Sequence, residues 1–346
     1  MITIDLGVFA HNEASCIGQF IEDLARQTLF GRADFNVRAL ILANGCTDDT
    51  EQVARAALAR TDAAFQRQCE LVMLQQGGKS RTWNEFTHRL SRPDAEFLLF
   101  LDADIRLPQA DTLARMIEAL IQRPELATFV SCPVKDIVHD RLQVGPIARL
   151  IALGGGTLFD FKISICGQLY ALRAGPAREV HMPVGLPVED GFLREMLLTH
   201  MLTRQGEDLS RIDGDADVFH VYESIRSVRE LLRHQVRIVI GSAINLALFR
   251  RLRQMKMSHA QLQRYLADVS QDDDWVRRTI RQELPQTPHG YVPFAFLNPR
   301  MRSLKAALRE RDLRRLPSIS GGVVMDVIVY LMASVKMARG VGANYW

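Results

Sequence analysis

The sequence has few cysteines, and their arrangement argues against two common kinds of small site. Its 346 residues include five cysteines, which are scattered, odd in number and without a Cys-x-x-Cys pair. Neither a disulfide framework nor a zinc site is therefore predicted. The N-terminus, MITIDLGVFAHNEA, has no basic segment followed by a long apolar one, so we interpret it as a first strand and not as a signal peptide. Both features favour a cytoplasmic protein.

Two familiar phosphate-binding motifs are also missing. GGKS at 77–80 ends like a Walker loop, but Met73 stands where that loop needs a glycine, five positions before the Gly-Lys pair. The first expected loop reads AHNEA at 10–14 and has no GxGxxG. A Walker-type ATPase and a dinucleotide-dependent oxidoreductase are therefore not predicted.

Long apolar runs are scarce. The longest near the C-terminus, VIVYLMA at 327–333, is flanked by Asp326 and Lys336. It falls far short of the roughly 20 residues that cross a bilayer, so no spanning helix is predicted. The wider apolar segment 322–338 has two interpretations: contact with a membrane surface, or packing on the core or in a homodimer interface.

Negative charge is scarce in one part of the chain. Residues 226–315 contain about 19 Lys and Arg against about 8 Asp and Glu, whereas residues 1–225 contain about 22 against about 31. The basic part is either the solvated face of Arg-rich helices or a surface that meets anionic lipid headgroups or an anionic acceptor. It has no interleaved aromatic residues, so nucleic acid is not a predicted partner.

Apolar strand-like runs alternate with amphipathic segments over the first 134 residues. The expected strands are 2–10, 37–44, 70–75, 96–104 and 126–134, and the expected helices are 17–29, 49–60, 80–90 and 111–122. This alternation predicts an α/β fold with a mostly parallel sheet and helices on both faces. Such sheets bind ligands at the carboxyl ends of their strands. The candidate loops are therefore 10–13, 44–48, 77–79 and 102–104.

Two carboxylates end the fourth of these strands. Asp102 and Asp104 follow the wholly apolar run EFLLFL, and paired charges at the end of a buried strand are costly unless a cation or ligand compensates them. Hard oxygen ligands favour Mg²⁺ or Mn²⁺ shared with the phosphates of a substrate. The alternative is a solvated turn in which the two aspartates cap a helix.

The four loops, taken in order, resemble the family 2 glycosyltransferases, which have the GT-A fold. The resemblance rests on AHNEA (10–14), ANGCTDDT (43–50), GGKSRTWNEF (77–86) and DAD (102–104), followed by CGQLYALR (166–173) and VEDGFLREML (188–197). It covers about the first 240 residues. It implies a Rossmann-like GT-A catalytic domain over 1–225, with a nucleotide-binding half (1–125) and an acceptor half (126–225). A basic, mostly helical C-terminal region follows at 226–346.

The resemblance also implies roles for individual residues. The donor, a nucleoside diphosphate sugar, would contact residues at the strand ends, namely Ala10, Asn12, Glu13, Asn44, Lys79 and Asp102. The divalent cation would be held by Asp104 and Asp102, and His220 matches a position where some relatives supply a further ligand. For each of these residues an ordinary structural role, such as helix capping or burial in the core, is the alternative.

The resemblance implies an inverting reaction as well. Asp190 is the expected general base, because a carboxylate at a helix start can take the proton of an attacking hydroxyl. A UDP-sugar is the expected donor, although Ala43-Asn44 replaces the usual carboxylate pair and leaves another base open. Arg237 in RHQVR matches an element of processive relatives but lacks their tryptophan, which favours the addition of a single sugar.

Other functions stay open at this point. A nucleotidyltransferase shares a similar sheet and metal use, and a non-catalytic sugar-nucleotide-binding protein would explain the change at Ala43-Asn44. The predicted acceptor is a hydroxyl group of a glycan or a lipid-linked molecule. The predicted location is the cytoplasm, with peripheral contact at the inner face of the membrane, and a homodimer is a further prediction.

Overall fold

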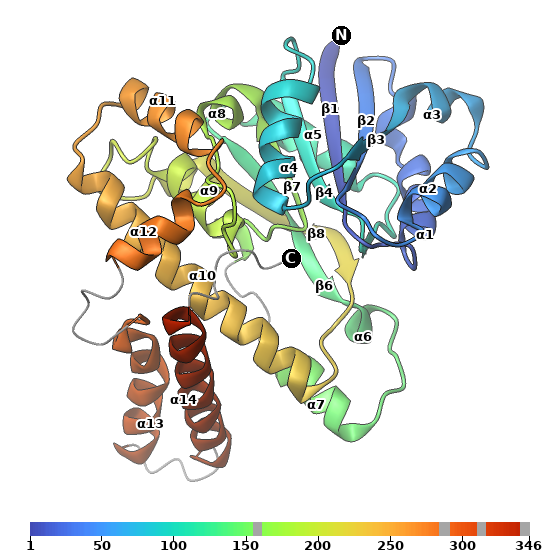
Figure 1. Cartoon of the computed structure of the whole chain (residues 1–346). Helices are drawn as coiled ribbons and strands as arrows, with labels where there is room; N and C mark the ends of the chain where they lie inside the picture. The colour runs from blue at the N-terminus through green and yellow to red at the C-terminus, as the bar shows by residue number, and fades with distance from the viewer. Residues whose placement is uncertain (155–160, 284–290, 310–315, 340–346) are drawn as a thin grey trace.

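A computed structural model describes the chain except for residues 155–160, 284–290, 310–315 and 340–346 (Figure 1). Its centre is one mixed sheet, which among the described residues has the strand order β3-β2-β1-β4-β7-β6-β8-β5. The strands are β1 (Ile2–Ala10), β2 (Phe35–Asn44), β3 (Cys69–Leu74), β4 (Phe97–Asp102), β5 (Ile105–Arg106), β6 (Thr128–Lys135), β7 (Leu169–Arg173) and β8 (Ile212–Tyr222). Strands β1 to β4 pair in parallel, as predicted, whereas β7 runs antiparallel to both β4 and β6.

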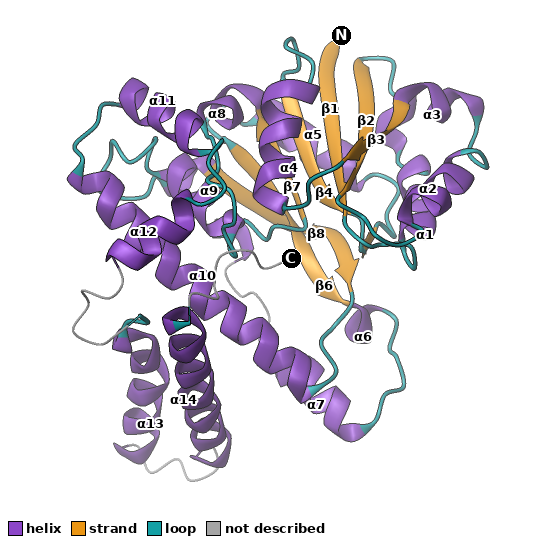
Figure 2. Ribbon diagram, in the orientation of Figure 1, coloured by secondary structure: helices purple, strands orange, loops and turns teal. Residues whose placement is uncertain are grey.

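Helices cover both faces of the sheet (Figure 2). Their bounds are α1 (Ile17–Ala25), α2 (Thr50–Leu58), α3 (Ala63–Gln68), α4 (Lys79–Glu85), α5 (Thr112–Gln122), α6 (Asp136–His139), α7 (Pro146–Gly154), α8 (Ala174–Glu179), α9 (Glu189–Leu198), α10 (Val228–Gln254), α11 (His259–Val269), α12 (Trp275–Glu283), α13 (Asn298–Arg309) and α14 (Leu316–Ala338). The predicted α/β fold is confirmed. Helix α3 and the short strand β5 were not predicted.

The alternation of side chains along the central strands builds two separate cores. In β4, Leu99 and Leu101 face a core shared with α1, α2 and α5. Leu98 and Phe100 face the other core, in which the ring of Phe100 makes stacked contacts with Trp83 of α4 and with Tyr170 of β7. Both faces of β4 are therefore buried, which explains why its sequence is continuously apolar.

The C-terminal helices belong to the second core. Buried apolar residues of α10, α11 and α12 pack in the same cluster as α9 and the sheet. At Gly241 of α10, a Cβ atom would lie 2.3 Å from Cγ2 of Val188, so the helix approaches the start of α9 more closely than any other residue would allow. Residues 226–283 are thus packed directly onto the predicted catalytic domain.

Helix α14 is longer than the apolar run seen in the sequence. It packs against α10 and α13 through one face, which includes Val329 and Ala333. Residues Ile319–Ala338 have a mean hydropathy of 1.6, and 11% of the segment is buried inside the protein. Among the described residues, it is the single helical segment long and apolar enough to cross a membrane. The length argument against a spanning helix was therefore wrong. One such helix is weak evidence for a span, because core helices pass the same test.

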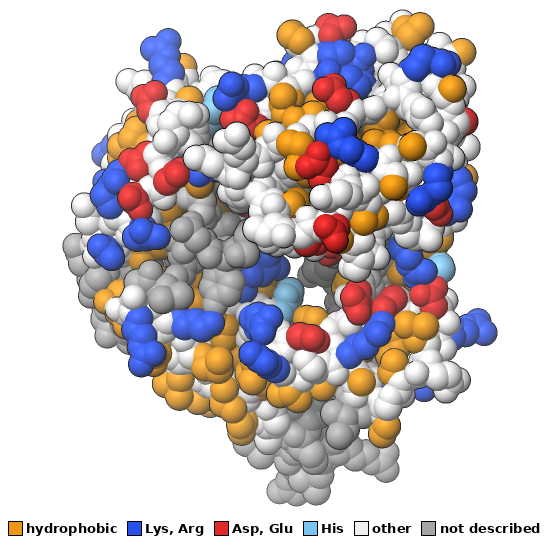
Figure 3. Space-filling model, turned by 45° about the vertical axis from the view of Figure 1, so that its right-hand side comes forward, with side chains coloured by type: hydrophobic (Ala, Val, Ile, Leu, Met, Phe, Trp, Pro, Cys, Tyr) orange, Lys and Arg blue, Asp and Glu red, His pale blue; other side chains and the backbone are white. Residues whose placement is uncertain are grey.

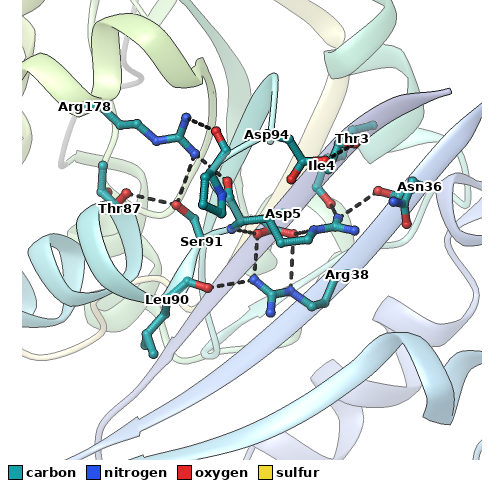
Figure 4. A network of polar contacts seen from close by, with 12 residues as sticks. Thr3, Ile4, Asp5, Asn36, Arg38, Thr87, Leu90, Ser91, Asp94 and Arg178 are labelled. Atoms are coloured by element: carbon teal, nitrogen blue, oxygen red, sulfur yellow. Dashed lines mark hydrogen bonds and ion pairs between the residues drawn. The ribbon is translucent and has the colours of Figure 1, made fainter.

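A buried ion-pair network joins the strands at the end of the sheet away from the candidate loops (Figure 4). Asp5 of β1 is fully buried and accepts from Arg38 of β2 at 2.8 Å and from Arg92, just before β4, at 2.7 Å. Arg38 also donates to the carbonyl of Leu90, and Arg92 to that of Ile4. The carboxylate of Asp5 thus connects β1 to β2 and to the segment before β4.

Candidate active site

The four candidate loops meet at one edge of the sheet. Phe9 of β1 is in register with Asp102 of β4, Ala10 with Ala43 of β2, and Asn44 with Leu74 of β3. Because these strands are parallel and adjacent, the loops that follow them lie side by side. The structure therefore brings the predicted donor-site segments together.

The side chain of Asn44 makes hydrogen bonds to the protein backbone. Its side chain is fully buried, where Nδ2 donates to the carbonyl of Ala10 at 2.9 Å and Oδ1 accepts from the amide of Gly78 at 3.3 Å. The residue thus fixes the ends of β1 and the glycine loop relative to each other. Its predicted contact with the donor stays a prediction, and the structure shows a positioning role.

Asn12 and Glu13 connect the loops after β1 and β2. Asn12 has a left-handed φ of 59°, and its Oδ1 accepts from the amide of Thr47 at 2.8 Å. The amide of Glu13 donates to Oγ1 of Thr50 at 2.8 Å, and its carboxylate accepts from the thiol of Cys16. Burial raises the pKa of Glu13. These residues hold the first two loops in a fixed arrangement.

Asp102 and Asp104 lie at the end of β4, in different surroundings. Asp104 is exposed, whereas Asp102 is largely covered, with 17% of its side chain accessible. Oδ2 of Asp102 accepts from Lys79, and Oδ1 is buried without a hydrogen-bond partner. Burial raises the pKa of Asp102 to about 7, Lys79 opposes this, and the charge of Asp104 adds to it. An orphaned carboxylate oxygen beside a second, accessible carboxylate fits a hard divalent cation.

Lys79 points into the protein. Its Nζ donates to Asp102 at 2.6 Å and to the carbonyl of Gly167 at 2.8 Å, and lies 3.5 Å from Glu189. Burial lowers the pKa of Lys79, but the charges of Asp102 and Glu189 outweigh it, so the net pKa is raised. Lys79 therefore links the end of β4 to the start of α9, a role that the predicted contact with the nucleotide did not include.

Asp190 contacts the same residue, Gly167, through the backbone amide of that glycine. Its Oδ2 accepts from the amide of Gly167 at 3.3 Å, and its Oδ1 accepts from the amide of Gly191 at 2.7 Å. Burial and the neighbouring charge of Glu189 raise the pKa of Asp190 to about 6, against the opposing charge of Lys79. A carboxylate with this pKa is suited to accept a proton near neutral pH.

His220 is a buried imidazole next to the site. It has no exposed surface, with Nδ1 3.0 Å from Oγ of Ser131 and Nε2 3.2 Å from Oε1 of Gln168, whose carbonyl accepts from the amide of Asp102. Burial lowers the pKa of His220 to about 3. In the described part of the chain, no three His, Cys, Asp or Glu side chains are grouped so that they could hold a metal ion. His220 as a metal ligand stays a prediction.

A cavity of about 430 Å³ opens beside the glycine loop. Gly45, with a φ of 57°, forms part of its wall, and a Cβ atom there would lie 2.6 Å from the amide nitrogen of Gly77, so only glycine fits. The lining residues are His11, Gly45, Gln75, Gly77 to Arg81, Val184 to Leu186, Asp273 and Asp274. The last two come from the C-terminal region. No sequence signal pointed to them, because they lie almost 200 positions beyond the glycine loop.

Comparison with known proteins agrees with this arrangement. Residues 5–156 match the model of the family described as glycosyl transferase family 2. This segment is a family 2 glycosyltransferase domain. The match confirms the predicted family and enzyme class, and the matched segment contains the four loops with Asp102 and Asp104. No curated protein sequence is significantly similar to the chain.

Solved structures of glycosyltransferases resemble this chain to different extents. A mannosyltransferase from Pyrobaculum calidifontis, in complex with GDP-Man and Mn²⁺, has a TM-score of 0.54 and 17% identity, covering 96% of this chain and 86% of its own. Glucosyl-3-phosphoglycerate synthase from Mycobacterium tuberculosis, with Mn²⁺, UDP-Glc and phosphoglyceric acid, has a TM-score of 0.45 and 17% identity, covering 72% and 79%. Mannosyl-3-phosphoglycerate synthase from Rubrobacter xylanophilus has a TM-score of 0.46 and 18% identity, covering 74% and 75%. The first of these confirms the GT-A fold.

Proposed function

We propose that the chain transfers a sugar from a nucleoside diphosphate sugar to an acceptor hydroxyl, with Asp190 as general base and a divalent cation at Asp102 and Asp104. The observation that carries this proposal is the position of Gly167. Its carbonyl accepts from Lys79, which holds Asp102, and its amide donates to Asp190. The backbone of one residue, Gly167, thus connects the end of β4 with the start of α9, which supports a single site with a cation on one side and the base on the other.

The chemistry follows from that geometry. The acceptor oxygen attacks the anomeric carbon, the bond from that carbon to the diphosphate oxygen breaks, and the diphosphate leaves with the electron pair. Asp190 takes the acceptor proton as the new bond forms. A bound cation would stabilise the negative charge on the departing diphosphate. Attack from the side opposite the leaving group inverts the anomeric configuration.

Mg²⁺ or Mn²⁺ is the cation that this donor set favours. The two carboxylates are hard oxygen ligands, and the unpartnered Oδ1 of Asp102 leaves one acceptor uncompensated. The mannosyltransferase with the same fold was solved with Mn²⁺ and GDP-Man, which supports a cation shared with a nucleoside diphosphate. A UDP-sugar is the donor predicted from the sequence resemblance.

The acceptor and the location are part of the same proposal. Helix α14 exposes an apolar face made of Val324, Val327, Ile328, Leu331, Met332 and Val335. Basic side chains of α13, among them Arg300, Arg302 and Lys305, lie on the helix packed beside it. In Figure 3, apolar and basic side chains adjoin on the lower part of the molecule. We propose peripheral contact with an anionic membrane on its cytoplasmic side and a lipid-linked acceptor.

The direct test of the proposed function is the release of nucleoside diphosphate from UDP-, GDP- and dTDP-sugars with and without Mn²⁺ or Mg²⁺. The proposal expects at least one of these sugar nucleotides to be turned over in a metal-dependent reaction. A chain that binds a sugar nucleotide without turning it over under any acceptor condition would be a binding protein instead.

A further inference from the structure

We propose that the turn at 272–274, between α11 and α12, forms one wall of the pocket for the nucleoside of the donor, held there by the ion pair between Arg81 and Asp273. This inference rests on the proposed function and gives the C-terminal region a part in donor binding. Asp273 and Asp274 line the cavity of about 430 Å³ together with the glycine loop. Three segments that are distant in sequence, 75–81, 184–186 and 273–274, thus enclose one space.

The position of the cavity relative to β4 suits a nucleoside. The cation-binding carboxylates end β4, whereas the cavity is lined by residues that follow β1, β2 and β3. Strands β2 and β3 lie two and three places from β4, which at a strand spacing of about 4.8 Å is roughly 10–14 Å. A donor whose diphosphate lies at β4 would therefore extend its ribose and base along the strand ends into this cavity.

Another wall of the cavity is apolar, and hydrogen bonds connect it to α4. Val184 and Leu186 are 7% and 3% exposed, and offer a surface against which a flat base can pack. Asn84 of α4 donates to the carbonyl of Met182 at 2.8 Å and accepts from its amide at 2.9 Å. These two bonds fix the segment before Val184 to the helix that follows the glycine loop.

The side chains at 273–274 offer acceptors to the nucleoside end of the donor. The carboxylates of Asp273 and Asp274 line the cavity and can accept hydrogen bonds from ribose hydroxyls or from the N–H groups of a base. Nη2 of Arg81 lies 2.7 Å from Oδ1 of Asp273 and joins the turn to α4 across 192 positions of sequence. The amide of Asp274 donates to Asp272 at 3.0 Å, so the turn also has internal support.

The test is the affinity for UDP and GDP in the presence of Mn²⁺, measured by titration calorimetry on the full chain. In Asp273→Arg two cations face each other, so we expect affinity for the better nucleotide to fall roughly tenfold. Affinity for Mn²⁺-pyrophosphate should stay unchanged, because pyrophosphate has no nucleoside. The charge-swapped double variant Arg81→Asp with Asp273→Arg should bind the nucleotide better than Asp273→Arg alone.

The matched control is Arg60→Gln, which breaks an exposed ion pair with Glu22 away from the cavity and should leave both affinities unchanged. Nucleotide binding by Asp273→Arg equal to that of the wild type would overturn the inference, as would an equal loss of pyrophosphate binding, which would indicate general damage. A wild-type chain that binds no nucleoside diphosphate with Mn²⁺ would instead contradict the proposed function itself, and this inference with it.

Discussion

At the scale of single residues, one lysine, Lys79, lowers the pKa of two carboxylates of the candidate site, Asp102 and Asp190. Lys79 contacts Asp102 and lies beside Glu189, and its charge opposes the effect of burial on the pKa of Asp190. The sequence placed Lys79, Asp102 and Asp190 at strand or helix ends, and the structure confirms those places. The sequence did not predict that Lys79 points inward toward Glu189. These two residues are 110 positions apart, and their contact depends on how β7 and α9 pack.

The pH dependence of transfer follows from Asp190. Its pKa is raised to about 6, so below pH 6 the carboxyl holds its proton and cannot accept another. We expect kcat/KM to rise with pH through about 6 and then level off. In Lys79→Met the acid limb should move to higher pH, since the lysine charge lowers this pKa. Initial rates between pH 4.5 and 8.5 measure both effects.

Asp190→Asn is the companion variant. It should lower kcat by roughly 10²- to 10⁴-fold, the usual contribution of a general base, and should abolish the acid limb. Glu51→Gln, on the outer surface of α2, is the control and should behave as the wild type. An Asp190→Asn variant that keeps both the rate and the limb would assign the base to another group.

At the scale of secondary structure, strands β1 to β4 and the helices between them could be predicted, because periodicity there is set by burial on both faces. Helix α14 shows where such prediction fails. Asp326 interrupts its apolar run, which made the segment seem short, but the structure pairs this carboxylate with Arg300 at 2.8 Å. Because Arg300 of the neighbouring helix neutralises Asp326, the apolar face of α14 continues past this residue. The sequence of α14 alone does not show this ion pair.

The network around Asp5 gives a stability prediction at this scale. Asp5→Ala leaves Arg38 and Arg92 without their buried acceptor, so we expect the free energy of unfolding to fall by about 3 kcal/mol. The exposed pair of Arg32 and Asp34 provides the control. Asp34→Ala should leave the free energy of unfolding close to that of the wild type, because exposed ion pairs add little stability. Urea unfolding of both variants measures the difference, and equal losses would contradict the role given to burial.

At the scale of the whole molecule, the C-terminal region packs against the domain and leaves an apolar face of α14 uncovered. Helix α10 packs against the start of α9 at Gly241, and Asp273 lines the candidate donor cavity. The exposed apolar face of α14 includes Ile328, Leu331 and Val335, which are 42%, 57% and 48% accessible. The basic charge of this region was evident from the sequence, but its position beside that face was not.

Membrane contact predicts a specific response to lipid charge and to this face. The chain should float with liposomes that contain anionic lipid at low salt, less at high salt, and not with neutral liposomes. Leu331→Glu with Val335→Glu should reduce flotation, whereas Leu209→Glu, an exposed apolar residue elsewhere, should not. Absence of binding at low salt would remove the lipid proposal. A concentration-dependent dimer lost in the double variant would assign the face to a second copy.

The central claim is that Asp102 and Asp104 hold a divalent cation at which a nucleoside diphosphate sugar is cleaved for transfer. Its most direct test is the initial rate of nucleoside diphosphate release from a panel of sugar nucleotides, with Mn²⁺ and with chelator, for the wild type, Asp104→Ala and the control Glu51→Gln. We predict metal-dependent release for the wild type and control, and a loss of at least about 100-fold in Asp104→Ala. Full release by Asp104→Ala, or release unaffected by chelator, would contradict the claim.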